Sequence, residues 1–253
     1  MKRFATILAC LALSACSLWP WGGEEQQPAQ PAGPRTIGVV SAIGDSITLA
    51  DVGSNGWQKG STTVSIESWH IDKTVTDEVT AALQQHNYDV RPVTYDPAKF
   101  SAAAIGGPVV RGGIFNRKQP DLGPIARSSV QPGNLDYYLV LVEAGADSGA
   151  YRLHGIGLLR QRGGLAAYAL YHAFLIDGHS GKTVADVRAE PLGNSWYDTS
   201  KIDGPFTSLD MKAWPKPITS STPEQQQMLH QAVETMLKQS LPRTVSAIVQ
   251  KQP

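Results

Sequence analysis

The amino-acid sequence predicts an α+β fold: a mostly antiparallel sheet with helices on one of its faces. Strand-like stretches follow one another along much of the chain, and only two longer stretches show the apolar spacing of an amphipathic helix. Parallel neighbours need a long crossover connection, so this order favours antiparallel pairing. Residues 36–253 are long enough to bury a hydrophobic core of their own. We therefore expect a single α+β domain at 36–253.

The first part of this region contains strands and a helix. Residues 36–44 are apolar on both faces, as in a buried strand, whereas 61–69 alternate between apolar and polar side chains. Residues 46–52 extend the first strand or pair with it. Apolar side chains then recur at helical spacing over 72–86, and a short strand follows at 87–93.

Glycine and proline interrupt the chain at 96–134 and again at 193–221. In the first of these segments we expect irregular loops with one short helix near 97–105, because glycine and proline disfavour regular elements. A loop region of this length in a compact domain often contributes to function. Both segments are therefore candidates for binding a partner.

Four further strands and the clearest helix complete the domain. The helix begins after Thr222, with Pro223 in its first turn and Gln225 completing a capping box. Pro242 should end or kink this helix. The strands are expected at 135–144, 151–160, 166–176 and 183–190, with a hairpin turn at 177–181.

The first sixteen residues carry signals for the location of the protein. Two basic residues precede an apolar run that is too short for a bilayer, which needs about 20 residues. The run closes with Leu13-Ser14-Ala15-Cys16, which resembles the lipobox of bacterial lipoproteins. The resemblance implies removal of a signal peptide at 1–15 and acylation of Cys16. An ordinary cleaved signal or an uncleaved anchor is the alternative.

The residues after Cys16 predict how the domain is held. Ser17 stands where an aspartate would retain a lipoprotein at the inner membrane, so the resemblance favours the outer membrane. Several acyl chains give stable membrane binding, whereas a single chain gives only marginal binding. Residues 16–35 contain four prolines with glycines and glutamines, and they predict a disordered tether. We therefore expect a lipid-anchored domain that faces the periplasm.

Composition excludes several classes of function. The two cysteines are Cys10, in the signal peptide, and Cys16, so the mature domain has no disulfide and no cysteine nucleophile. Loss of residues 1–15 leaves 20 basic against 22 acidic residues, a balance that predicts no nucleic-acid partner. Neither a metal-ligand spacing nor a nucleotide-binding glycine motif is present, and we expect no metal and no cofactor.

Part of the domain resembles known periplasmic domains. An amphipathic helix leads into Asn87-Tyr88-Asp89-Val90, and a later strand ends in the turn at 177–182. Both features are similar to the N-terminal domain of TolB and to the curli-secretion lipoprotein. The resemblance implies an α+β fold and carries no catalytic residues.

One motif resembles an enzyme site. Gly44-Asp45-Ser46-Ile47 is similar to the first block of the GDSL/SGNH hydrolases, in which the serine attacks an ester. Such a serine needs a histidine base and a carboxylate, but the Asp-x-x-His and Gly-x-Asn-Asp blocks of that family are absent. Our prediction is therefore a non-enzymatic module that binds a cell-envelope protein or glycan through a sheet edge or the two loop segments. Ester hydrolysis at Ser46 is the alternative.

Overall fold

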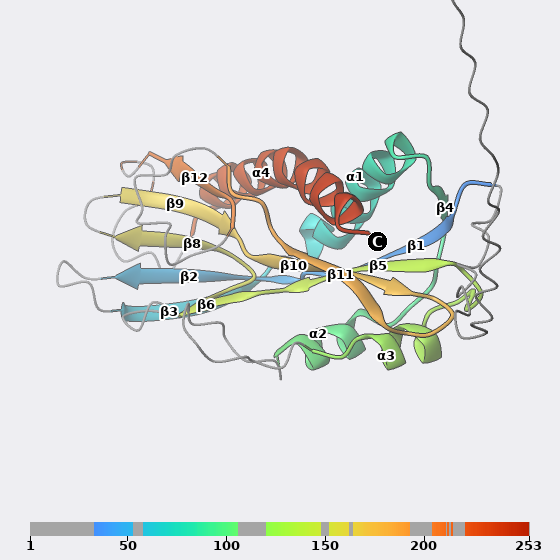
Figure 1. Ribbon diagram of the computed structural model, residues 1–253. Coiled ribbons are helices and arrows are strands. Elements are labelled where there is room, and N and C mark those ends of the chain that lie inside the picture. The colour runs from blue at the N-terminus through green and yellow to red at the C-terminus, as the bar shows by residue number, and fades with distance from the viewer. Residues whose placement is uncertain are drawn as a thin grey trace, which may run out of the picture. The chain divides into compact units, whose positions relative to one another are not determined.

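The computed structural model describes residues 33–52, 58–105, 120–147, 152–161, 164–192, 204–210, 212, 214 and 221–252. These residues form two mixed five-stranded sheets and four α-helices (Figure 1). The α+β class is confirmed, and six of the nine strand pairs are antiparallel. The expected signal peptide, Cys16 and most of the tether lie outside the described residues, as does the turn expected at 53–56.

The first sheet has the strand order β11-β10-β5-β1-β4. In this sheet β1 runs parallel to both β4 and β5, while the pairs of β10 with β5 and β11 are antiparallel. The strands are β1 (Thr36–Ala42), β4 (Asp89–Arg91), β5 (Tyr137–Glu143), β10 (Tyr171–Asp177) and β11 (Thr183–Arg188). The hairpin expected between the last two strands is confirmed.

Helices cover the first sheet on both faces (Figure 1). On one face lie α1 (Ile71–Gln85) and α4 (Pro223–Gln250), and on the other lie α2 (Pro97–Ile105) and α3 (Gly123–Ser129). We expected helices on one face only. The second layer exists because β1 is apolar on both sides: Val39 packs in the core under α1 and α4, and Val40 in the core with α2 and α3.

The second sheet has the order β12-β9-β8-β2-β3. Its strands are β2 (Ser46–Val52), β3 (Gln58–Ser65), β8 (Ile156–Gln161), β9 (Gly164–Ala169) and β12 (Phe206–Leu209). A separate pair consists of β6 (Gly145–Asp147) and β7 (Arg152–His154).

The chain crosses between the two sheets at short connections. From β1 it passes through Ile43–Asp45 into β2, and from β9 through Leu170 into β10. The single strand expected at 166–176 is therefore two strands, one in each sheet. Likewise the strand expected at 151–160 is divided into β7 and β8 at Gly155, which has a φ of +51°.

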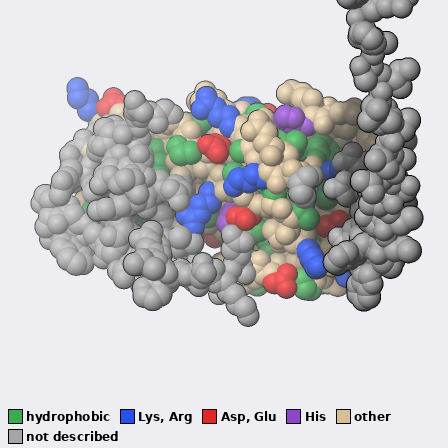
Figure 2. Space-filling view, viewed as in Figure 1, with side chains coloured by type: hydrophobic (Ala, Val, Ile, Leu, Met, Phe, Trp, Pro, Cys, Tyr) green, Lys and Arg blue, Asp and Glu red, His purple; other side chains and the backbone are tan. Residues whose placement is uncertain are grey.

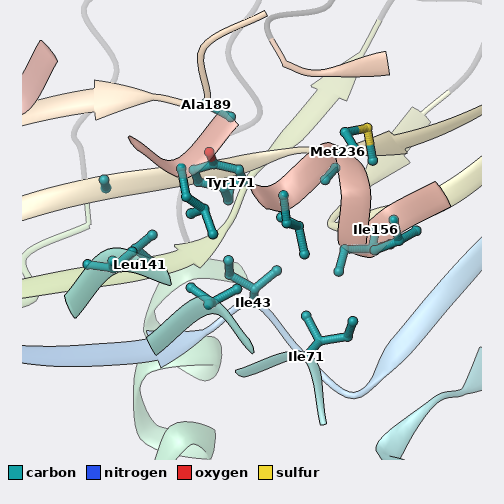
Figure 3. Packing of buried hydrophobic residues seen from close by; sticks show 14 of the residues in the cluster. Ile43, Ile71, Leu141, Ile156, Tyr171, Ala189 and Met236 are labelled. Carbon is teal, nitrogen blue, oxygen red and sulfur yellow. The ribbon is translucent and has the colours of Figure 1, made fainter. Parts of the chain in front are cut away.

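The main core lies between the sheets and the helices α1 and α4. Figure 3 shows Ile43 and Ile71 beside Leu141 of the first sheet and Ile156 of the second, with Met236 of α4 above them. All five side chains are almost fully buried. The helix α4 packs on strands of both sheets, so this one core holds the two sheets together.

The C-terminal helix α4 begins as the sequence predicts. Thr222 Oγ1 accepts from the Gln225 backbone N–H at 3.3 Å, and the Thr222 N–H donates to Gln225 Oε1 at 2.8 Å, which is the expected capping box. Pro242 does not end the helix, which continues to Gln250. Buried Leu241 and Val245 flank the proline, so tertiary packing holds the helix despite the lost hydrogen bond.

The two helices on the other face differ in how well the sequence predicts them. The short helix expected near 97–105 is present as α2. The helix α3 was not expected, because its flanking Gly123-Pro124 and Ser128-Ser129 favour loops. In the described part of the chain, no helix is both long enough and apolar enough to cross a membrane.

Candidate functional site

The carboxyl ends of the parallel strands β1 and β5 form a topological switch point. From there α1 packs on β1 on one face of the first sheet, while α2 packs on β1 and β5 on the other face (Figure 1). In the sheet, β4 lies on one side of β1, and β5, the next strand of this sheet along the chain, lies on the other side. Open sheets of this kind bind ligands outside the carboxyl ends of their strands, at such a point. This end of the sheet is therefore our candidate site.

Asp72, in the first turn of α1, ties this helix to the end of β1. Its Oδ1 accepts from Ser41 Oγ at 2.6 Å and from the Ile43 backbone N–H at 3.0 Å. Burial raises the pKa of the Asp72 carboxyl, and the negative charge of Asp45 raises it further, although the hydrogen bonds oppose the shift. The carboxyl group is thus held in place by groups that are far from it in the sequence.

Tyr95, between β4 and α2, adds a third segment to this network. The Ser41 backbone N–H donates to the Tyr95 hydroxyl at 3.0 Å, and the Tyr95 ring meets Phe100 of α2 edge to face at 6.1 Å. Burial raises the pKa of the Tyr95 hydroxyl. The residue Ser41 therefore joins β1, α1 and the segment after β4 in one hydrogen-bonded unit.

A cleft of about 420 Å³ opens beside this network, between α1 and the edge strand β4. Asp72 and Tyr95 both line it, and Val39 and Val90 contribute apolar surface. The charged groups at its walls are of both signs, because Lys73 pairs with Asp77 on α1 and Arg91 is also present. The remaining lining residues are Thr76, Thr80, Pro92 and Val93.

Glu143, the last residue of β5, is a second carboxyl group at this end of the sheet. It lies against Gly44 and Gly155: a Cβ added at either glycine would stand 2.8 or 2.7 Å from Glu143 Oε1. Both glycines also have positive φ, of 110° and 51°. Burial raises the pKa of Glu143, and the charge of Asp72 raises it further. The positive φ therefore favours glycine at both positions, and a Cβ at either one would require the Glu143 side chain to shift.

The chemistry of this region is that of a hydrogen-bonding surface with two carboxyl groups that retain protons more readily than usual. Asp72 and Tyr95, both with raised pKa values, line the cleft, and such groups in a cleft are typical of functional sites. Within the described residues there is no cluster of three histidine, cysteine or acidic side chains that would hold a metal ion. The polar side chains that line the cleft carry hydroxyl groups and charges of both signs.

Ser46 lies next to this region but lacks the contacts of a catalytic serine. It is the first residue of β2 and pairs with Ser65 of β3, whereas the GDSL/SGNH serine opens a helix. Among the hydrogen bonds of the described residues, none joins Ser46 to a histidine. Of the six described histidines, four have the following neighbours: His86 contacts Ser246, His172 contacts Asp186, His179 contacts Asp136, and His230 contacts Glu234 and Trp69.

Sequence reasoning missed the three residues at the centre of the candidate site. The predicted helix begins near Asp72, but nothing nearby in the sequence indicates that its carboxyl group bonds β1. Tyr95 lies one residue before the segment 96–134, in which the sequence predicts loops and one short helix. Glu143 gives the clearest signal, because it ends an otherwise apolar strand. An acidic residue at the end of a buried strand is therefore the sequence feature that could have indicated this site.

Comparisons with known proteins do not assign this chain to a family. No family model matches it, and no curated protein matches it. Among solved structures it is similar to the hypothetical protein CT253 of Chlamydia trachomatis, with a TM-score of 0.37 and 7% identity over 85% of this chain and 96% of that one. It is also similar to the lipoprotein GNA1162 of Neisseria meningitidis, with a TM-score of 0.30 and 14% identity over 82% of this chain and 100% of that one.

The resemblances noted in the sequence keep their status after these comparisons. Neither the lipobox nor the similarity to the TolB and curli-secretion domains is tested by them, and both stay predictions.

Proposed function

We propose that this chain is an outer-membrane-anchored periplasmic lipoprotein, and that its domain is a non-enzymatic module that binds a cell-envelope partner. The motif Leu13-Ser14-Ala15-Cys16 supports the lipid anchor, and the proline-rich segment at 16–35 supports a tether. As a flexible coil, a segment of this length spans about 25 Å. A domain on such a tether reaches partners away from the membrane surface.

The main support for a binding role is the cleft between α1 and β4. Its walls belong to a helix and a strand that Ser41, Asp72 and Tyr95 hold together by hydrogen bonds, so its shape exists before a partner arrives. A preformed site costs less conformational entropy on binding. Threonine hydroxyls, an ion pair and apolar valines line it together, a mixture that suits a polar protein segment or a glycan.

The lipid anchor is tested by replacing Cys16. In the variant Cys16→Ala, acylation has no acceptor, so the protein should move from the membrane fraction to the soluble fraction of lysed cells. Labelling with a radioactive fatty acid should be lost at the same time. Cys10→Ala is the matched control, because that residue would be removed with the signal peptide. Persistent membrane association of Cys16→Ala would exclude the lipobox.

The binding role is tested by photo-crosslinking in living cells. A photoreactive amino acid at Thr80, which lines the cleft, should form an adduct that the same group at exposed Gln239 of α4 does not form. Arg91→Glu, which reverses one charge of the cleft, should reduce the yield of the Thr80 adduct. A yield that is the same at both positions would exclude the cleft as the binding site.

A further inference from the structure

Three of the four edge strands in the two sheets carry features that hinder pairing with another chain. The strand β4 has only three residues and is followed by Pro92. The strand β12 has only four. On β11, Lys251 Nζ donates to the Asp186 carbonyl oxygen at 3.0 Å, and Arg188 adds a charge. Short strands, prolines, charges and covering groups are the means by which proteins protect open sheet edges.

The fourth edge strand, β3, carries such features at one end only, where Lys59 lies at a shift of the pairing register with β2. It is eight residues long, and its segment 60–65 contains neither a charge nor a proline. Ser61, Thr63 and Ser65 are exposed, while Thr62 and Val64 are half-buried. Within the part of the chain that the structure describes, β3 pairs with β2 alone. Its outer edge therefore presents backbone N–H and C=O groups that are ready to pair with another strand.

We propose that two copies of this chain associate through β3, as antiparallel strands related by a two-fold axis. Side chains alternate between the faces of a sheet, so two-fold pairing must set residues of the same face opposite each other. This condition is met when Thr63 pairs with Thr63 of the second copy. Ser61 then lies opposite Ser65, and Thr62 opposite Val64.

The chemistry of β3 fits a second copy of itself. In this register no two like charges face each other, and within 61–65 every pair joins hydroxyl or β-branched side chains, which are favourable cross-strand neighbours. Pairing joins the two second sheets edge to edge and covers the longest open edge of each copy. Two-fold dimers are the commonest symmetric assemblies of soluble proteins. This inference requires neither acylation of Cys16 nor a ligand in the cleft, so it stands apart from the proposed function.

The test uses the full chain in mild detergent and measures its association by analytical ultracentrifugation over a wide range of protein concentration. We expect a reversible monomer–dimer equilibrium. In Thr63→Lys two lysine side chains would face each other across the axis, with Cβ atoms about 5 Å apart, and the repulsion of their positive charges should raise the dimer dissociation constant about tenfold or more. Thr63→Val, which keeps a neutral β-branched residue, should associate like the parent chain.

Thr183→Lys is the matched control, because Thr183 is an exposed residue of the protected edge strand β11. This variant should dimerise like the parent chain, and thermal unfolding should show that all the variants are folded. A parent chain that is monomeric at every concentration would overturn the proposal. So would an equal loss of association in Thr63→Lys and Thr183→Lys.

Discussion

The strands β1 and β3 lie close together in the sequence, yet their surroundings in the structure are opposite. After Thr36 every residue of β1 is buried, it has a parallel neighbour on each side, and helices cover both faces of its sheet. In β3 the exposed and half-buried residues alternate over 61–65, and the strand pairs only with β2. A continuous apolar strand needs cover on both faces, whereas an alternating strand needs it on one.

The largest expected difference between the two strands comes from removing the same side chain in each. Val40→Ala deletes fully buried atoms of β1 and should lower the free energy of unfolding by about 2–3 kcal/mol. Val64→Ala, in β3, removes half-buried atoms and should cost less than about 1 kcal/mol. Urea denaturation of both variants measures the difference. Equal losses would show that the cover over β1 contributes no extra packing.

A smaller change for each variant is expected from adding a methyl group to each strand. A Cβ at Gly38 of β1 would lie 2.7 Å from Val93 Cγ1 and 3.0 Å from Leu135 Cδ1, whereas a Cβ at Gly60 of β3 meets nothing within 4 Å. Gly38→Ala should therefore destabilise the chain by about 1–2 kcal/mol, because both neighbours must shift.

Gly60→Ala serves as the matched substitution and should raise stability by up to about 1 kcal/mol, because alanine loses less conformational freedom in a strand. Thermal unfolding of the two variants and the parent chain measures both changes in stability. Destabilisation of similar size by both alanines would mean that the edge of β3 is as closely packed as β1.

The smallest expected effect concerns the end of β1, where the chain leaves the covered sheet for β2 and β3. Burial and Asp72 raise the pKa of Glu143, so the folded chain holds this proton more tightly than the unfolded chain. This group then adds stability as the pH falls through its raised folded pKa, and the gain is complete below its ordinary value of 4.5. At neutral pH the charged carboxyl lowers stability.

Glu143→Gln removes this buried charge. It should raise the free energy of unfolding at pH 7 modestly and flatten its increase towards pH 4.5, as measured by urea denaturation across that range. Glu67→Gln, at an exposed position just after β3, should leave the curve unchanged. A variant at position 143 with the same pH dependence as the parent chain would contradict the assignment of Glu143.

Much of the fold is predictable from short stretches of sequence. The helix at α1 follows from the spacing of Val75, Val79 and Leu83, and the start of α4 from Thr222 and Gln225. These features depend on residues within a few positions of one another. The expected position of α2 is also correct, whereas α3 is not predicted because its ends carry glycine, proline and serine.

The division of the strands between two sheets is not predictable in this way. Residues 166–176 form one apolar run, and nothing within it indicates that Leu170 separates two strands of different sheets. Similarly, the apolar character of β1 on both faces predicts that it is buried, but not that α2 and α3 supply the second layer. Such features depend on which distant segments pack together.

The candidate site is likewise not predictable from local sequence patterns. Ser41 and Asp72 are 31 residues apart, and Ser41 and Tyr95 are 54 apart, so no spacing rule connects them. Ser46, which the sequence does single out, lies next to this network without a histidine bonded to it among the described residues. The motif at 44–47 therefore lies at the same end of the sheet as the candidate site, but its serine is not one of the residues that form the hydrogen-bonded network there.

The sequence by itself determined the type and order of most elements, the lipobox-like motif before the domain, and the capping of α4. These depend on local backbone preferences and on side chains a few positions apart, which act in the same way wherever the segment lies. Tertiary structure set the division into two sheets, the helices on both faces of β1, and the hydrogen bonds that join Ser41 to Asp72 and Tyr95. These features depend on the burial of apolar surface between segments far apart in the chain. A local sequence pattern does not specify which distant segment will pack against it.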